Sequence, residues 1–299
     1  MSKKKALLIV LTITLIVVLI SCELLMEKPQ KPNVKVLLVA LDYDKSADFR
    51  FTRLDGTIRD AKEMGKALKS LNPSTEVFEM YREGDQPPLF ETDDYPTKDK
   101  ILAKVGSILG TLNENDLFIF YYAGHGYKGS GDLAVASDTA KNVYETLKVK
   151  ELLDEFNKID KGHAVLILDS CYSGQFVPSY NFDDKHYNPN LLVFSASSSK
   201  QDSYETTISL PYGVKHYHGV FTNLFLEAIG WDHGDGSGEE FDANGVLIKV
   251  AGSLKKSPVI QNGTITFSSI FSYVSKRINK QRPFIVRGPI DKVLYSERW

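Results

Sequence analysis

Four short apolar segments constrain the fold of this chain more than any other feature of its sequence. They cover residues 34–41 (VKVLLVAL), 117–123 (LFIFYYA), 163–168 (HAVLIL) and 191–194 (LLVF). Uninterrupted apolar runs of this length, rich in β-branched and aromatic residues, are typical of strands that are buried on both faces. We therefore predict a sheet that is mostly parallel and covered on both sides.

Amphipathic helical patterns alternate with these strands. Apolar residues recur at spacings of three and four in residues 57–71, 97–112 and 149–159, and residues 76–80 form a further short strand candidate. Strands that alternate with helices indicate βαβ units with right-handed crossovers. The predicted fold class is α/β, a three-layer sandwich with a mostly parallel sheet flanked by helices. Later in the chain we predict helices at 220–229 and 265–278 and a closing strand at 283–286.

The composition is that of an ordinary globular protein. The chain has 299 residues, of which 42% are hydrophobic, and this is enough for one large core. Its 36 basic and 38 acidic residues give a formal net charge of −2, so no global positive field attracts a polyanion. We expect no nucleic-acid partner.

The N-terminal segment does not belong to the predicted fold. Residues 3–5 are lysines, and residues 6–20 are apolar but fewer than the ~20 residues of a membrane span. The segment ends at Ser21-Cys22 and resembles the signal of bacterial lipoproteins, in which this Cys is lipidated. An uncleaved anchor helix is the alternative. The lipoprotein interpretation predicts a signal peptide at 1–21, a tether at 22–33 and one domain at 34–299, exported and held at a membrane of the bacterial cell envelope through lipidated Cys22.

Cysteine usage then singles out one thiol. The chain has two cysteines, and lipidation of Cys22 would leave Cys171 alone, without a disulfide partner. A buried small side chain is the usual role of a free Cys, and a reactive thiol is the alternative.

The surroundings of Cys171 favour the reactive thiol. Cys171 follows one apolar strand and His125 follows another, and ligands of open α/β sheets bind at the carboxyl ends of the strands. Gly124 and Gly126 flank His125, which leaves room for a substrate backbone and frees an N–H for an oxyanion. His125 could instead be an exposed turn residue. With both residues at strand ends, we predict a thiol nucleophile paired with an imidazole acid and base.

Two sequence motifs resemble a known family. Residues 121–126 (YYAGHG) and 166–174 (LILDSCYSG) are similar to the paired His and Cys motifs of caspase-like peptidases, especially metacaspases. The resemblance implies a caspase-haemoglobinase-like fold and a cysteine endopeptidase of the C14 type. It also implies that the backbone N–H groups of Gly126 and Cys171 bind the oxyanion. A non-catalytic caspase-like lipoprotein, binding a peptide or protein partner in the same cleft, is the alternative.

The resemblance also bears on substrate preference. Caspases that cut after Asp carry an Arg two positions before an early strand-end Gly, and here Leu54 precedes Gly56 at that spacing. Metacaspases cut after Arg or Lys and carry an acid two positions before the nucleophile, where this chain has Asp169. We align Glu205 with the second pocket acid of the family, with Asp202 as the fallback. A carboxylate pair would bind a guanidinium or ammonium group, although such acids are often only solvated surface residues.

Metal ions and cofactors have little support in the sequence. The histidines show no metal-ligand spacing with Cys171, so we expect no zinc site and no cofactor. Residues 231–240 (WDHGDGSGEE) are rich in Gly and Asp but lack the EF-hand pattern, and we interpret them as a solvated loop. Calcium activation is thus implied only by the resemblance to metacaspases. The histidines considered are His163, His186, His216, His218 and His233.

Overall fold

The computed structural model describes seven stretches of the chain, and the segments Pro32–Ser296 form one compact unit. The signal peptide predicted at 1–21, with Cys22 and nearly all of the tether, lies outside the described residues. Among the described residues, no helix is long and apolar enough to cross a membrane. The described stretches are 31–43, 50–83, 92–137, 144–177, 188–243, 245–286 and 291–299.

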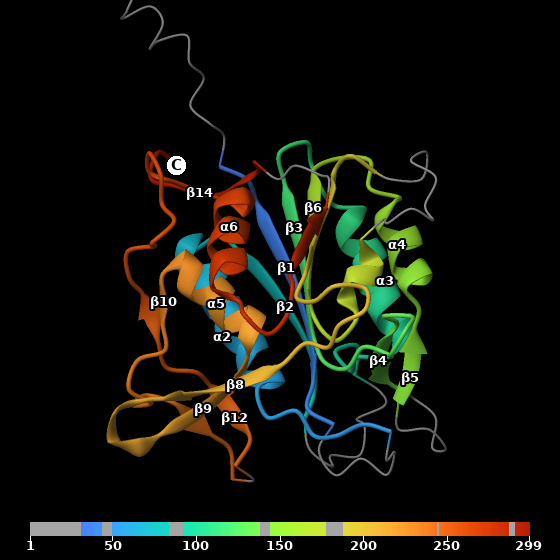
Figure 1. The fold of residues 1–299 in the computed structure, drawn as a ribbon. Helices are drawn as coiled ribbons and strands as arrows, with labels where there is room; N and C mark the ends of the chain where they lie inside the picture. The colour runs from blue at the N-terminus through green and yellow to red at the C-terminus, as the bar shows by residue number, and fades with distance from the viewer. Residues whose placement is uncertain are drawn as a thin grey trace, which may run out of the picture. The chain divides into compact units, whose positions relative to one another are not determined.

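A six-stranded sheet in the order β15-β7-β6-β3-β1-β2 forms the centre of this unit (Figure 1). Five strands are parallel, and β15 joins the β7 edge in the antiparallel direction. Every residue of β3 is buried, which confirms the prediction of a strand covered on both faces. The strands are β1 (Val34–Leu41), β2 (Glu76–Arg82), β3 (Leu117–Ala123), β6 (His163–Asp169), β7 (Leu191–Ser195) and β15 (Phe284–Val286).

Helices cover both faces of the sheet, as Figure 1 shows. One face packs against α2 (Thr57–Leu71), α5 (Val220–Ile229) and α6 (Phe267–Arg277), and the other against α3 (Lys98–Leu109) and α4 (Val149–Phe156). Two separate apolar cores result, one on each side of the sheet. The predicted three-layer α/β fold is therefore confirmed.

Helices α3 and α6 have boundaries that differ from the predictions. Helix α3 begins after its N-cap Thr97, whose side chain accepts the N–H of Lys100, and it ends at Leu109, three residues early. Helix α6 begins two residues late because Thr264–Thr266 (β14) pairs with Val293–Ser296 (β16) instead. Tertiary pairing thus overrides the local helical pattern at this end.

Small antiparallel pairs beside the sheet were not predicted. The first two pairs named in the next sentence lie near the carboxyl ends of the central strands and line or support the site described below. The pairs are β4 (Leu133–Ala136) with β5 (Tyr144–Leu147), β8 (Glu205–Ser209) with β9 (Lys215–Gly219), β10 (Trp231–Asp232) with β13 (Ser253–Leu254), and β11 (Glu240–Phe241) with β12 (Leu247–Lys249).

The interpretation of residues 231–240 as a solvated loop is wrong for three side chains. Trp231 and His233 are buried, with 4% and 9% of their surface exposed. The side chain of Glu239 is 6% exposed because it forms an ion pair with Arg59 of α2. The Gly- and Asp-rich composition hid these contacts, since each partner lies more than 150 residues away in the sequence.

Candidate active site

The sheet places His125 and Cys171 at equivalent positions beyond two neighbouring strands. Strands β3 and β6 are adjacent and parallel, and their register pairs Ala123 with Asp169. His125 and Cys171 each follow two residues later. The two loops also touch, because a Cβ added at Gly126 would overlap the carbonyl oxygen of Cys171. Only glycine fits at this position, because the backbone of the Cys171 loop occupies the space that we expected a substrate backbone to take.

Both residues line one pocket with a volume of about 270 Å³ at this end of the sheet. Its wall comes from the loops after β1, β3, β6 and β7, from the first residues of α2 and β8, and from the last residue of β9. The acids predicted from the sequence, Asp169, Asp202 and Glu205, lie in the same wall. The lining residues are Thr52, Leu54, Thr57, Asp60, Ala123, Gly124, His125, Asp169, Ser170, Cys171, Asp202, Ser203, Tyr204, Glu205 and Gly219.

Hydrogen bonds fix both the backbone and the ring of His125. Its backbone N–H donates to the Tyr43 hydroxyl at 2.9 Å, and its Nε2 lies 2.7 Å from the carbonyl oxygen of Thr52. A carbonyl only accepts, so we assign the proton to Nε2, which leaves a lone pair on Nδ1. The ring stacks on Phe51 with a centroid separation of 5.2 Å. Burial lowers the pKa of His125, while the bond to Thr52 acts in the opposite direction.

Cys171 lies in a strained turn with its sulfur half-buried. The next residue, Tyr172, has φ 57° and occupies the left-handed region that non-glycine residues rarely adopt. The backbone N–H of Ser203 donates to Sγ at 3.3 Å. Burial nevertheless raises the pKa of the thiol to about 11. Burial also lowers the pKa of His125, and both shifts favour a neutral thiol beside a neutral imidazole at neutral pH.

The predicted oxyanion groups lie where the two loops meet. Gly126 forms an antiparallel bridge with Leu133, and the hydrogen bonds of this bridge run through His125 O and Tyr127 N. The bridge therefore leaves the N–H of Gly126 uncommitted. Tight packing of Gly126 on the Cys171 backbone keeps the two peptide groups close to each other.

The three predicted pocket acids differ in their environments. Asp169 is buried at 7% exposure and accepts bonds from the hydroxyls of Ser203 and Thr222, both at 2.7 Å. Glu205 is half-buried and accepts the N–H of Gly56 at 2.7 Å. Asp202 is exposed at the pocket wall. Burial raises the pKa of Asp169 and that of Glu205, against smaller lowering by their hydrogen bonds.

Asp60 of α2 is a pocket acid that the sequence reasoning missed. It is 1% exposed and accepts the N–H of Gly219 at 2.7 Å. A Cβ added at Gly219 would overlap Asp169 Oδ2 and lie 3.3 Å from Asp60 Oδ2, so this glycine separates the two carboxylates. Burial and the nearby Asp169 raise the pKa of Asp60 well above its usual range. One signal was available: Asp60 lies among the apolar positions of an amphipathic helix, where an acid is unusual.

Comparisons with known proteins bear on the family and the fold of the chain. The sequence matches the caspase domain of the C14 peptidases over residues 36–295. No curated protein sequence matches the chain at a significant level. A crystal structure of a protein from Geobacter sulfurreducens is similar, with a TM-score of 0.51, 14% identity, and coverage of 86% of this chain and 94% of that chain. At this identity the structural similarity shows a shared fold.

The family match spans most of the chain and includes both strand-end motifs. A caspase domain supports a cysteine-peptidase-like function that acts on a peptide or protein substrate. The chain therefore belongs to the caspase-domain family of C14 peptidases.

Proposed function

We propose that this protein is a cysteine endopeptidase that cleaves after Arg or Lys, with Cys171 as the nucleophile and His125 as the acid and base. The observation that carries the proposal is the composition of the shared pocket. Of its fifteen lining residues, all within the described part of the chain, four are acids and none is Lys or Arg. The thiol and the imidazole thus lie beside a pocket that suits a cationic side chain.

The first half of the reaction follows from the neutral state of the pair. Nδ1 of His125 accepts the proton of the Cys171 thiol as the sulfur attacks the carbonyl carbon of the scissile bond. The carbonyl π electrons move to oxygen, and the N–H groups of Gly126 and Cys171 stabilise the oxyanion. In this order of events the sulfur carries no full negative charge before it attacks. The pocket therefore does not have to bear the desolvation cost of a preformed thiolate.

The second half releases both products. The tetrahedral intermediate collapses, the C–N bond breaks, and protonated His125 donates its proton to the leaving amine. Water then attacks the thioester on Cys171 while His125 takes a proton from that water. The second tetrahedral intermediate collapses, the C–S bond breaks to release the carboxylic acid product, and His125 returns the proton to the sulfur of Cys171. Thr52 holds Nε2 throughout, so the ring keeps the orientation that both transfers need.

The electrostatics of the pocket favour a basic side chain next to the scissile bond. Burial raises the pKa values of Asp60, Asp169 and Glu205, because each carboxylate has lost solvent without gaining a cation in the pocket. A guanidinium or ammonium group would supply that cation and form charge-assisted hydrogen bonds. A carboxylate side chain would instead meet like charges.

A conservative substitution tests the proposed specificity. Asp169→Asn keeps the shape of the side chain but removes its charge, and we expect kcat/KM for Arg peptides to fall by roughly 10–100-fold, as for loss of a charged hydrogen bond of about 1.5–3 kcal/mol. Asp154→Asn, on the exposed part of α4, makes the same chemical change as a control. Equal preference for Arg and Ala peptides in the wild-type protein would overturn the specificity.

We also propose that the protein is anchored at a membrane of the bacterial cell envelope through lipidated Cys22. The support is the sequence of residues 1–22, in which lysines, an apolar segment and Ser21-Cys22 follow in the order of a lipoprotein signal. An anchored peptidase would act on substrates close to the membrane surface.

A further inference from the structure

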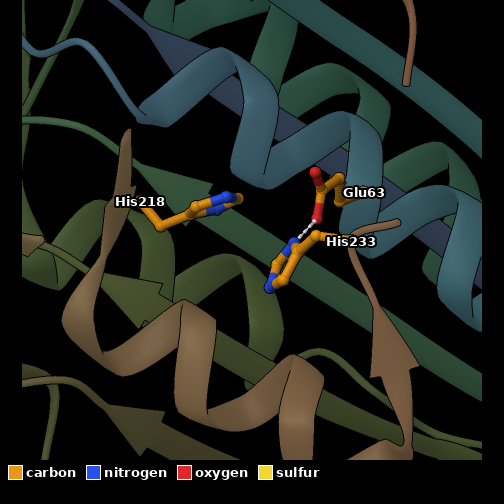
Figure 2. A group of neighbouring side chains, drawn as sticks. All are labelled: Glu63, His218 and His233. Carbon is orange, nitrogen blue, oxygen red and sulfur yellow. Dashed lines mark hydrogen bonds and ion pairs between the residues drawn. The ribbon is translucent and has the colours of Figure 1, made fainter. Parts of the chain in front are cut away.

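Three buried side chains from distant parts of the chain converge next to helix α2, as Figure 2 shows. They are Glu63 of α2, His218 of β9 and His233 just after β10, with exposures of 1%, 0% and 9%. One carboxylate oxygen and one nitrogen from each ring all lie within 4.8 Å of one another. The sequence prediction of no zinc site considered only spacing relative to Cys171, and this cluster does not include Cys171.

Hydrogen bonding leaves one nitrogen of His218 as a buried lone pair. Its Nδ1 lies 2.7 Å from Asp60 Oδ1, so Nδ1 carries the proton and donates to the carboxylate. Nε2 is then unprotonated, and among the described residues it has no hydrogen-bond partner. A carboxylate that orients one imidazole nitrogen and frees the other is the usual outer contact of a metal-binding His.

The hydrogen bonds of Asn223 show which nitrogen of the His233 ring carries the proton. Asn223 donates through Nδ2 to Glu227 Oε1 at 3.0 Å, and its Oδ1 therefore faces His233 Nε2, also at 3.0 Å. An amide oxygen accepts, so Nε2 of His233 carries the proton. The lone pair of Nδ1 then points at Glu63 Oε2, 2.5 Å away. At this distance an unprotonated Nδ1 would repel the carboxylate, so the contact requires either a second proton on His233 or a cation that both atoms bind.

Charges around the cluster favour a cation. Glu63 Oε2 also accepts the indole N–H of Trp231 at 2.7 Å, which fixes the carboxylate. Arg59 lies 3.8 Å from the other oxygen of Glu63 but is committed to a bidentate pair with Glu239. Asp60, Glu63 and Glu239 face this guanidinium and the His216 ring. The ammonium group of Lys66 lies farther out, 5.8 Å from the centre of the Trp231 ring, and donates to the carbonyl oxygens of Val250 and Ala251. The buried carboxylates gain a counter-charge if a cation binds.

We propose that Glu63, His218 and His233 bind a divalent transition-metal ion of the Zn²⁺ type. Two imidazole nitrogens with one carboxylate suit Zn²⁺, whereas Ca²⁺ requires oxygen ligands. Zinc lies about 2.0–2.2 Å from such ligands, which places tetrahedral ligand atoms roughly 3.4 Å from one another. His233 Nδ1 and Glu63 Oε2, now 2.5 Å apart, therefore separate when the ion binds, and the more distant ligand atoms of the cluster draw closer. The lone pairs of the two rings, each oriented by an outer hydrogen bond, become ligands.

The metal site is joined to the proposed specificity pocket by Asp60. This side chain bonds to His218 through Oδ1 and to the N–H of Gly219 through Oδ2, and Gly219 packs against Asp169. If the proposed peptidase function holds, metal binding positions the acids that receive the substrate side chain. Removal of the metal then raises KM for Arg peptides more than it changes kcat.

Binding is tested directly with Co²⁺ and Zn²⁺ on the full chain. The double variant Cys22→Ser/Cys171→Ala removes both thiols, which also attract zinc, and keeps all three ligands. We expect one equivalent of Co²⁺ to bind, with visible absorption of a low-symmetry nitrogen and oxygen site, quenching of the adjacent Trp231 fluorescence, and displacement by Zn²⁺. Failure of this thiol-free protein to bind either ion would overturn the proposal, leaving a protonated His233 paired with Glu63.

Ligand variants locate the bound ion. We expect Glu63→Gln and His233→Asn to weaken binding by more than the roughly 10–100-fold that loss of an outer partner costs. His163→Asn, at the opposite end of β6, is the matched control and keeps full affinity. Circular dichroism checks that each variant is folded. Undiminished Co²⁺ binding in folded Glu63→Gln and His233→Asn would place the ion elsewhere and contradict the assignment, whatever the peptidase assay gives.

Discussion

At the scale of single residues, the Thr52 carbonyl determines how the His125 ring works. By accepting Nε2–H, this uncharged group leaves Nδ1 as the ring nitrogen that can act as a base. A carboxylate in that place would raise the pKa of the imidazole, whereas burial here lowers it. The arrangement fits a neutral pair in which the proton moves only during attack.

The neutral pair predicts a particular pH dependence of alkylation. Burial raises the pKa of Cys171 to about 11, so the reactive thiolate becomes scarcer at neutral pH and more abundant as pH rises. We expect the rate of iodoacetamide labelling, measured in Cys22→Ser, to increase continuously above pH 8. A plateau reached below pH 7 would show a preformed thiolate–imidazolium pair and contradict this account.

Gly126 is the residue that allows the His and Cys loops to touch. A side chain there would overlap the Cys171 carbonyl, so we expect Gly126→Ala to lower the unfolding free energy by about 1–3 kcal/mol and to abolish peptidase activity. Gly110→Ala is the control, since its Cβ would lie 3.5 Å from the nearest atom. Thermal unfolding and turnover of both variants provide the comparison. Equal stability and activity of Gly126→Ala and the wild type would argue against contact between the loops.

The residues of the site differ in how far the sequence revealed them. That His125 and Cys171 line one pocket was predictable, because each follows an apolar strand that can be recognised without tertiary information. Asp60 and Glu63 were missed because their partners, His218 and His233, lie 158 and 170 positions later in the chain. No local sequence pattern encodes such contacts, although two buried acids on one amphipathic helix indicate that both have specific partners.

At the scale of elements, the loops after β1 and β3 are tied together by Tyr43. Its hydroxyl donates to the Ala134 carbonyl at 2.6 Å, accepts the N–H of His125 and contacts the hydroxyl of Tyr122. Ala134 belongs to the β4–β5 hairpin, so this single hydroxyl connects three elements beside the pocket. The position of His125 thus depends on elements far from it in sequence.

Removing that hydroxyl tests the coupling. In Tyr43→Phe the N–H of His125 loses its partner, while Ala134 O still accepts from Tyr122. We expect a loss of about 1–3 kcal/mol in stability and a lower kcat at nearly constant KM. Tyr212→Phe, at a residue that is 93% exposed, is the control and should change neither. Unaltered kcat in Tyr43→Phe would show that His125 is positioned by Thr52 alone.

The large elements were predictable and the small ones were not. Strands β1 and β3 and helices α2 and α5 have the predicted bounds, because long apolar periodicity dominates their local preference. Strand β8 has no buried residue and carries no alternation that would identify it. Its pairing depends on contacts such as Glu205 with Gly56, which hold it against the start of α2.

At the scale of the whole molecule, the caspase fold predicted from the motifs follows from one sheet with two apolar cores. The site residues come from both halves of the chain, since Asp60 lies on α2 and Gly219 precedes α5. Cooperative formation of the sheet is therefore a condition for the pocket, and the order of the parallel strands decides which loops meet.

The proposed anchor gives a prediction for the complete chain in a bacterial host. We expect the wild-type protein to partition with membranes and to incorporate labelled fatty acid, because a lipidated Cys22 inserts its acyl chains into the bilayer. Cys22→Ser should lose the label, whereas Cys171→Ala should retain it. Fatty-acid labelling followed by membrane fractionation measures both. Label that persists in Cys22→Ser would contradict the lipoprotein assignment.

The central claim is that Cys171 and His125 catalyse peptide hydrolysis next to an acidic pocket. The most direct measurement is the kcat/KM of the purified chain for peptides that differ only in carrying Arg, Lys, Asp or Ala before the scissile bond, with Cys171→Ala and His125→Ala alongside. We predict cleavage after Arg and Lys that disappears in both variants. Full activity in either variant, or no cleavage of any peptide by the folded wild-type protein, would contradict the account.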